Sequence, residues 1–250
     1  SAIMNRGERV IAVSETVRDY LQQHYPGLPA ERIQVIQRGV DPAAFPYAYR
    51  PPNGWVDEWH RRYPQLREAP VLTLPGRLSR LKGHEDFIEL IARLRARDSK
   101  VYGLIVGGPE PRRQAYADQL RKAVRSRGLE GIVFFTGHRR DIREIYAVST
   151  LVLSLSAKPE SFGRTVLEAL SLGTPVIGYD RGGVGEILRR IYPPGLVAAG
   201  DLEAVVGRVS ELLGDPPPVP PESAYPLQRM LDQTLALYRE IGQRPRQPSK

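Results

Sequence analysis

The chain has 250 residues, of which 41% are hydrophobic and 26% charged, with a formal net charge of +8. This is the composition of a globular protein with room for one or two cores. Without cysteine it can form no disulfide or thiolate metal site, its four histidines lack metal-ligand spacing, and no apolar run approaches the ~18 residues of a membrane span.

The N-terminal part is expected to form a strand, a helix and a second strand over residues 8–36. A connector rich in proline and aromatic residues follows, over residues 38–54. The chain enters its first strand almost at once, unlike the start of a natural protein. We therefore expect a fragment that lacks an N-terminal part.

Six short apolar runs then alternate with helical patterns between residues 70 and 214. The expected strands begin at Pro70, Val101, Gly131, Thr150, Pro175 and Gly195. Such alternation predicts an α/β fold with a doubly wound parallel sheet, Rossmann-like, whose ligand lies outside the carboxyl ends of the strands. Asp141 and Glu144 match a capping box for the helix that follows the third strand.

Proline-rich residues 214–226 predict a stiff spacer, and an amphipathic helix follows from about Leu227 to Ile241. The predicted organisation is thus residues 1–45, a linker with a short helix over 46–69, the sheet domain over 70–215, and a spacer with a terminal helix over 216–250.

The loop after the first strand of the sheet carries two fixed cations. Gly76 and Arg77 begin the segment "GRLSRLKG", and Lys82 and Gly83 end it. Glycines allow close approach of the backbone to a ligand, and the following helix adds the positive end of its dipole. The loop suits a diphosphate, although two solvated bases are the alternative interpretation.

The segment "PESFGRTVLEAL" sets Glu160 and Glu168 on either side of a predicted helix start. Eight positions span ~12 Å along a helix, whereas a hydrolase pair needs roughly 5–9.5 Å. The two carboxylates are better suited to binding two parts of one long ligand. The amides between them, at Phe162, Gly163 and Arg164, are expected to form an anion-binding site. The alternative is that both glutamates are surface charges.

Other strand ends are less specific. Gly137, His138 and Arg139 could hold a base or form a basic turn, and Gly182-Gly183 gives permissive backbone before a helix. Leu81 stands where a P-loop needs glycine, and the sequence has neither G-x-G-x-x-G nor G-x-S-x-G. An ATP-type P-loop, a dinucleotide fingerprint and a nucleophile elbow are therefore excluded.

Taken together and in order, "RVIAVSE", "GRLSRLKG", "LIVGGP", "ESFGRTVLE" and "GTPVIGYDRGGVGEIL" resemble family 4 retaining glycosyltransferases of the GT-B fold. The resemblance runs from about residue 8 to 214. It implies the C-terminal, donor-binding half of such an enzyme with only the tail (1–45) of its N-terminal acceptor domain.

The resemblance also implies roles. A sugar would pass from a nucleotide-diphosphate donor, most suitably UDP-linked, without a metal or further cofactor. Arg77 and Lys82 would clamp the diphosphate, Glu160 would meet the sugar hydroxyls and Glu168 would hold the ribose. Catalytic roles fall on Glu160, Lys82 and Arg77, and the other implied donor-site residues are Gly76, Gly137, His138, Arg139, Phe162, Gly163, Arg164, Thr165, Gly182 and Gly183.

The implied acceptor is a glycan, lipid-linked in many relatives, as in envelope polysaccharide or lipopolysaccharide biosynthesis in bacteria. We expect it to bind through the missing domain, so the fragment alone would bind donor without turning over. We also expect a cytoplasmic location, and the net charge motivates a hypothesis of peripheral contact with the inner face of the membrane.

Three other classes of protein are alternatives to this one: a sugar-nucleotide 2-epimerase, a basic nucleic-acid-binding domain and a relative with a dead site. Nothing in the sequence marks the first, no aromatic-rich strand supports the second, and the intact Arg77, Lys82, Glu160 and Glu168 oppose the third.

Overall fold

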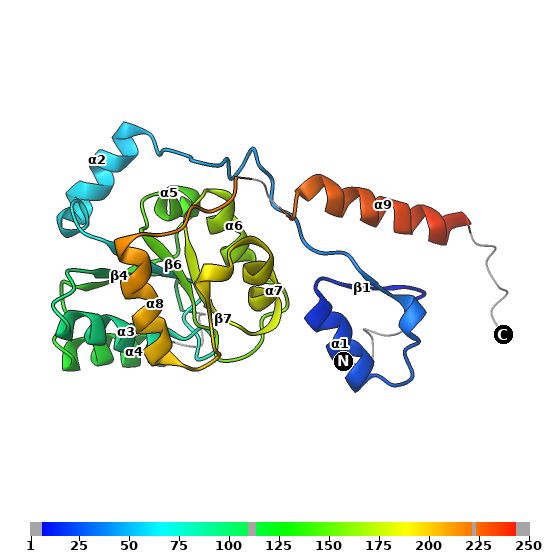
Figure 1. Cartoon of the computed structure of the whole chain (residues 1–250), viewed down its shortest axis with the longest axis horizontal. Coiled ribbons are helices and arrows are strands. Elements are labelled where there is room, and N and C mark those ends of the chain that lie inside the picture. Colours follow the sequence, from blue (N-terminus) through cyan, green and yellow to red (C-terminus); the bar gives the residue numbers. More distant parts are fainter. Residues whose placement is uncertain (1–6, 110–113, 222–223, 244–250) are drawn as a thin grey trace.

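A parallel six-stranded sheet forms the core of the larger body of the computed structural model, which describes residues 7–109, 114–221 and 224–243 (Figure 1). The strand order is β5-β4-β3-β6-β7-β8, and every pairing is parallel. The strands are β3 (Val71–Pro75), β4 (Tyr102–Val106), β5 (Val133–Gly137), β6 (Leu151–Ser154), β7 (Val176–Tyr179) and β8 (Leu196–Val197). All six predicted strands are present, and the predicted Rossmann-like α/β fold is confirmed.

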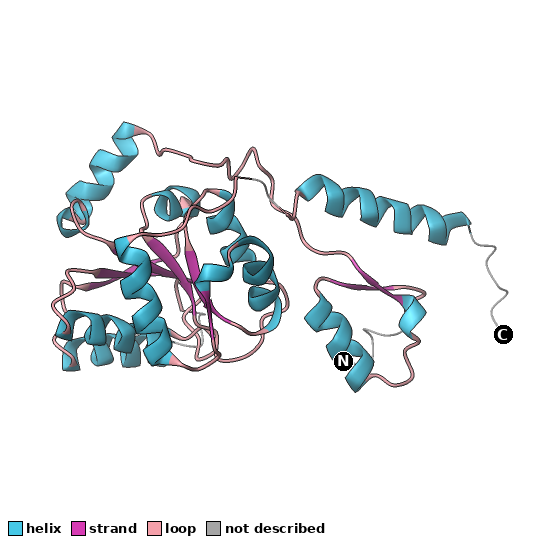
Figure 2. Cartoon of the chain, viewed as in Figure 1, coloured by secondary structure: helices cyan, strands magenta, loops and turns pink. Residues whose placement is uncertain are grey.

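Two layers of helices cover the sheet (Figure 2). In one layer α3 contacts both α4 and α8, and in the other α6 contacts both α5 and α7. Every residue of β3, β6 and β7 is buried, as continuous apolar runs predict for strands covered on both faces. The helices are α3 (His84–Ala96), α4 (Gln114–Ser126), α5 (Ile142–Ala147), α6 (Arg164–Ser171), α7 (Gly182–Ile191) and α8 (Leu202–Gly214).

The order of the strands reverses between β3 and β6. The chain runs outward from β3 through β4 to β5, then returns to the other side of β3 and runs outward again through β7 to β8. The crevice outside the carboxyl ends of strands at such a switch point is where open α/β sheets bind ligands. The loops after Pro75 and Ser154 flank this crevice.

The N-terminal residues form a two-stranded sheet of their own. Strands β1 (Val10–Ala12) and β2 (Ile33–Val35) pair in parallel and are joined by α1 (Glu15–His24) and a 3₁₀ helix (Ala30–Arg32). Ser14 caps α1 by accepting a hydrogen bond from the amide of Val17 at 3.2 Å.

The terminal helix α9 (Leu227–Gln243) returns to this unit (Figure 1). Arg9 Nη2 lies 2.5 Å from Glu240 Oε1, and the amide of Leu227 donates to the carbonyl of Val40 at 3.0 Å. The predicted helix, about Leu227 to Ile241, is present. Its large hydrophobic residues Leu231 and Tyr238 remain exposed.

A helix in the predicted linker belongs to the packed body. In α2 (Asn53–Arg62) Trp59 is 3% exposed, and with Tyr63 it packs against Leu104 and Val106 on the sheet. Two 3₁₀ helices, Pro64–Leu66 and Pro193–Gly195, complete the secondary structure of the described residues.

The predicted capping box at Asp141 is wrong. The Asp141 side chain makes no capping bond to α5; its carboxylate accepts from Arg139 Nε at 2.8 Å and from Trp55 Nε1 at 2.8 Å. Glu144 accepts from the Tyr49 hydroxyl at 2.9 Å. Both carboxylates are thus engaged by side-chain donors, two of them from the linker, instead of by the helix amides.

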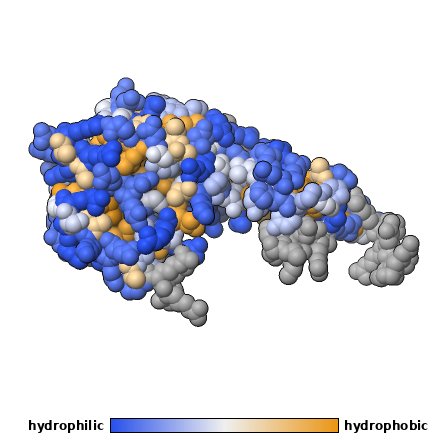
Figure 3. Space-filling model, turned by 90° about the horizontal axis from the view of Figure 1, so that it is seen from below, coloured by the Kyte–Doolittle hydropathy of each residue, from blue (hydrophilic) through white to orange (hydrophobic). Residues whose placement is uncertain are grey.

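The face of the molecule in Figure 3 is mainly hydrophilic, with hydrophobic side chains in separate patches. Among the described residues, no helix combines the length and the hydropathy that crossing a bilayer would require.

Candidate functional site at the switch point

A pocket of about 470 Å³ opens beside the carboxyl ends of β3, β4 and β5. Gly76 and Arg77 line it from the loop after β3, and Thr165 and Glu168 line it from α6. The other lining residues are Pro75, Val106, Gly107, Gly108, Pro109, His138, Arg139, Ile142 and Tyr146. Six of the predicted site residues therefore share one pocket: Gly76, Arg77, His138, Arg139, Thr165 and Glu168.

The loops after β3 and β6 meet through an ion pair. Lys82 Nζ lies 2.8 Å from Glu160 Oε1, with the two side chains 25% and 20% exposed. The Ser156 hydroxyl donates to the same oxygen. The amide of Ala157 donates to the carbonyl of Leu81 at 2.9 Å and so joins the two loops a second time. Sequence reasoning brought Lys82 and Glu160 to one site but did not foresee their direct contact.

Glu160 and Glu168 line different hollows. Glu160 borders a small depression with Ser156 and Tyr179, whereas Glu168 borders the larger pocket. Gly76 connects the two, since it lines the pocket and its backbone lies against the Lys82 side chain. The arrangement suits a long ligand with polar groups at both ends.

Glu168 is buried, so its interpretation as a wet surface charge is wrong. The residue is 8% exposed, and its Oε1 accepts from Arg164 Nε at 2.7 Å. Burial raises the pKa of the Glu168 carboxyl, and the Arg164 guanidinium offsets this only in part.

The start of α6 is packed against the start of α7. Gly163 precedes α6, and the Phe162 side chain is 5% exposed and packs on Tyr225. Helix α7 begins two residues earlier than the sequence suggests, so Gly182 and Gly183 belong to its first turn. A Cβ on Gly183 would lie 2.4 Å from the Phe162 Cα, which explains glycine there.

Loops 159–163 and 181–184 are also joined by hydrogen bonding. The Gly183 amide donates to the Glu160 carbonyl at 2.9 Å. This bond fixes the backbone of Glu160 beside the helix start. Of the remaining predicted residues, Gly137 ends β5, and Arg139 directs its guanidinium to Asp141.

Sequence reasoning missed Tyr146 and Ile142 of α5. Both line the pocket, yet both read as ordinary apolar positions of a helix. Only the packing of α5 beside α6 turns them toward the pocket.

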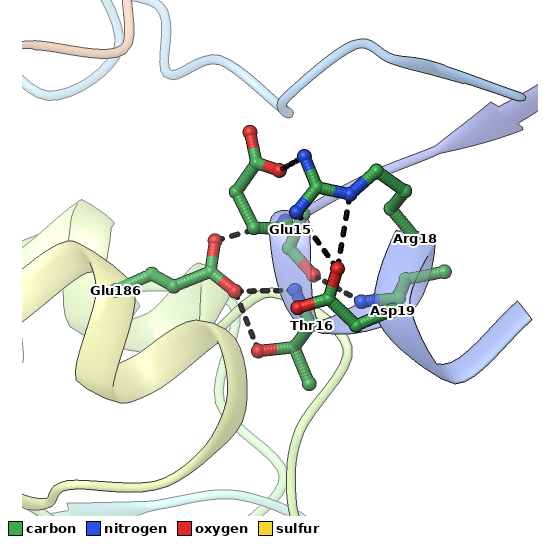
Figure 4. A network of polar contacts seen from close by, with 7 residues as sticks. Glu15, Thr16, Arg18, Asp19 and Glu186 are labelled. Carbon is green, nitrogen blue, oxygen red and sulfur yellow. Dashed lines mark hydrogen bonds and ion pairs between the residues drawn. The ribbon is translucent and has the colours of Figure 1, made fainter. Parts of the chain in front are cut away.

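The N-terminal unit reaches the site through α1 and α7 (Figure 4). Glu186 of α7 accepts hydrogen bonds from the Glu15 amide at 3.0 Å and from the Thr16 amide at 2.6 Å. The Ser14 hydroxyl donates to the Ser161 carbonyl at 2.6 Å. A carboxylate at a helix N-terminus also stabilises the helix dipole. Residues 14–16 are thereby held directly beside the Glu160 loop.

His84, the first residue of α3, supports the cationic loop from beneath. It is 0% exposed, and its Nδ1 lies 3.3 Å from the Ser79 carbonyl. Burial lowers the pKa of the His84 imidazole from 6.5 to about 4.

We expect this histidine to make the fold less stable in mild acid. The unfolded imidazole takes a proton near pH 6.5, while the folded one resists it down to about pH 4. The unfolded state therefore binds more protons in that window, and stability falls as pH falls through it, by about 2 kcal/mol between pH 7.5 and 5. We would measure the free energy of unfolding with urea at both pH values. In His84→Asn its fall between pH 7.5 and 5 should be about 2 kcal/mol smaller than in the wild type. His24→Asn, at an exposed position, is the control and should behave as the wild type; equal pH dependence in all three proteins would contradict the assignment.

Within the described ranges, no group of three or more histidine or acidic side chains is placed to hold a metal ion.

Two family models match this chain. The family model described as "Glycosyl transferases group 1" matches residues 56–226, and the model described as "Glycosyltransferase Family 4" matches residues 1–44. The chain is 29% identical over 253 residues to D-inositol 3-phosphate glycosyltransferase 1 of Catenulispora acidiphila, covering 96% of this chain and 59% of that protein. It is 28% identical over 214 residues to the lipopolysaccharide core biosynthesis mannosyltransferase LpcC of Rhizobium leguminosarum, covering 86% and 56%.

Solved structures agree on the fold. A glycosyltransferase from Rickettsia africae aligns with a TM-score of 0.83 at 25% identity, covering 98% of this chain and 66% of that one. Alr3699/HepE of Anabaena, in complex with UDP and glucose, aligns with a TM-score of 0.80 at 24% identity, covering 97% and 65%. The chain thus spans less than two thirds of the length of both sequence relatives, and about two thirds of both structures.

Proposed function

We propose that this chain, which belongs to the glycosyl transferases group 1 family, binds the nucleotide-diphosphate-sugar donor of a retaining glycosyl transfer. UDP is the proposed nucleotide, because a structural relative is described with UDP and glucose bound. The acceptor we propose is a glycan or a lipid-linked glycan, because one relative is a lipopolysaccharide core biosynthesis mannosyltransferase.

One observation carries the proposal: two cations and two carboxylates from distant segments gather at the switch point of the sheet. Lys82 pairs with Glu160 at 2.8 Å, and Arg77 shares a pocket with Glu168. A long ligand with an anionic centre and hydroxyl groups at both ends matches this distribution of charge.

The proposed chemistry follows from these charges. As the bond between sugar and diphosphate breaks, negative charge grows on the leaving phosphate and the sugar gains oxocarbenium character. Lys82, Arg77 and the amides at the start of α6 would stabilise the leaving group in place, as preorganised dipoles and charges do. Glu160 would orient the sugar through its hydroxyls, and Glu168 the ribose. His138 and Arg139 would border the base.

We further propose the domain organisation expected from the sequence. Residues 1–45 would be the end of an acceptor domain, 46–69 a linker, 70–215 the donor domain and 216–250 the return segment. This chain would then bind donor without transferring sugar by itself. We also propose contact with an anionic membrane surface, which the net charge of +8 suggests. Sedimentation with anionic and neutral liposomes tests this, and equal binding to both would count against it.

Calorimetric titration of the chain with UDP-, GDP- and ADP-sugars tests the proposal. One nucleotide class should bind, and Glu168→Ala should weaken that binding. Affinity for a nucleic acid that falls steeply with salt and ignores Glu160→Ala and Glu168→Ala would instead indicate a nucleic-acid-binding domain. Absence of binding by all three donor classes would contradict the proposal.

A further inference from the structure

The hydroxyl of Tyr146 is an unusual feature of the pocket. Tyr146 lies on α5, is 0% exposed, and its hydroxyl has no hydrogen-bond partner among the described residues. Buried side-chain hydroxyls nearly always have a partner, because burying one without a hydrogen bond costs free energy. An unpartnered hydroxyl beside a ligand pocket therefore calls for a reason.

Packing alone does not supply that reason. The Tyr146 ring belongs to the main hydrophobic core, and its carbonyl accepts a hydrogen bond from the Thr174 hydroxyl at 2.9 Å. A phenylalanine would fill the same space without a polar atom. Tyr192 offers a contrast, since it is 1% exposed but its hydroxyl donates to the Pro217 carbonyl at 3.0 Å.

Two charged residues, Glu168 and Arg164, act on Tyr146, and Glu168 lines the same pocket. Burial and the negative charge of Glu168 raise the pKa of the Tyr146 phenol well above 10.0, against the opposing effect of Arg164. The phenol therefore keeps its proton, and toward a carboxylate it acts as a hydrogen-bond donor. Glu168 is thus a suitable acceptor within the same pocket.

The Glu168 carboxylate has an exchangeable partner. It is paired with Arg164, whose side chain is 75% exposed. Ion pairs with a solvent-exposed cation are weak and are screened by salt. A carboxylate has about four acceptor positions, enough for two hydroxyls of a ligand and one further donor.

On the basis of the proposed function, we propose that Tyr146 is a positioning residue for the nucleotide: when ribose hydroxyls bind Glu168, the Tyr146 hydroxyl donates to the same carboxylate and holds it toward the ligand. The hydroxyl, which has no partner among the described residues, gains one when the nucleotide binds. Part of the affinity for a ribonucleotide then depends on this single oxygen atom.

Tyr146→Phe tests the inference, because it removes only that atom. UDP affinity, measured by calorimetry, should fall at least fivefold. The affinity for 2′,3′-dideoxyuridine diphosphate should be the same in both proteins, since that probe brings no ribose hydroxyl to Glu168. In a Glu168→Ala background, which removes the acceptor, the same substitution should have no further effect on UDP affinity.

Unfolding of the ligand-free proteins provides the matched control. Tyr146→Phe should leave the thermal midpoint unchanged or raise it, because an unpaired hydroxyl is removed. Tyr192→Phe removes a paired hydroxyl outside the pocket and should lower the midpoint while leaving UDP affinity unchanged.

Three results would overturn the inference. They are equal UDP affinity in wild type and Tyr146→Phe, an equal loss for UDP and the dideoxy probe, or a further loss in the Glu168→Ala background. If the wild type binds no nucleotide at all, the proposed function fails first, and the two failures are distinguished.

Discussion

Replacing Lys82 by alanine is expected to weaken UDP binding about 10- to 100-fold, which corresponds to roughly 1.5–3 kcal/mol for a hydrogen bond to a charged group. Lys82 is the cation that joins the loops after β3 and β6, with Nζ 2.8 Å from Glu160 and only 25% of its side chain exposed. A charge so shielded from water is screened less than one on the open surface. Calorimetric titration of both proteins with UDP measures the effect.

Two controls separate a phosphate contact from a general disturbance. Uridine carries no phosphate, so its affinity should be the same for wild type and Lys82→Ala. Lys122→Ala removes an exposed lysine of α4 and should leave UDP affinity unchanged. Undiminished UDP binding by Lys82→Ala would place the diphosphate elsewhere.

The second large effect is expected on folding. Gly83→Ala should destabilise the protein by about 3–5 kcal/mol, from a left-handed backbone and a steric conflict together. Gly83 has φ +74°, and a Cβ there would lie 1.9 Å from the Leu155 carbonyl oxygen, a backbone atom that cannot step aside. The substitution would force apart the two loops that carry Lys82 and Glu160.

Gly131→Ala is the matched control. Gly131 also has φ +74°, but nothing lies within 4 Å of a Cβ at that position. It should therefore cost only the backbone strain, about 1–2 kcal/mol. Urea unfolding of the two variants measures the difference, and equal destabilisation would mean that the close approach of Gly83 to Leu155 contributes nothing.

The local pattern of the sequence was sufficient for the fold. All six strands, the N-terminal strand–helix–strand and the terminal helix follow from periodicity, because strands buried on both faces are apolar throughout and helices repeat every 3.6 residues. The alternation of the two implies parallel strands. The loop after the first strand then indicates Arg77 and Lys82, and the segment "PESFGRTVLEAL" indicates Glu168.

Details of the site depended on residues far apart in the chain. The capping box at Asp141 failed because Trp55, from the linker, competes for its carboxylate. The sequence left open whether Glu168 is a wet or a buried charge, and the answer comes from α5 packing beside α6.

The sequence by itself therefore determined the class of fold, the order of its elements and the residue types at the ends of its strands, since these arise from interactions between near neighbours in the chain. Tertiary structure alone decided that Lys82 meets Glu160, that Glu186 holds the start of α1, and that the buried Tyr146 hydroxyl has no partner among the described residues. Hydrogen bonding and desolvation depend on atoms that only folding brings within about 3 Å of one another, and no spacing along the chain encodes such distances directly.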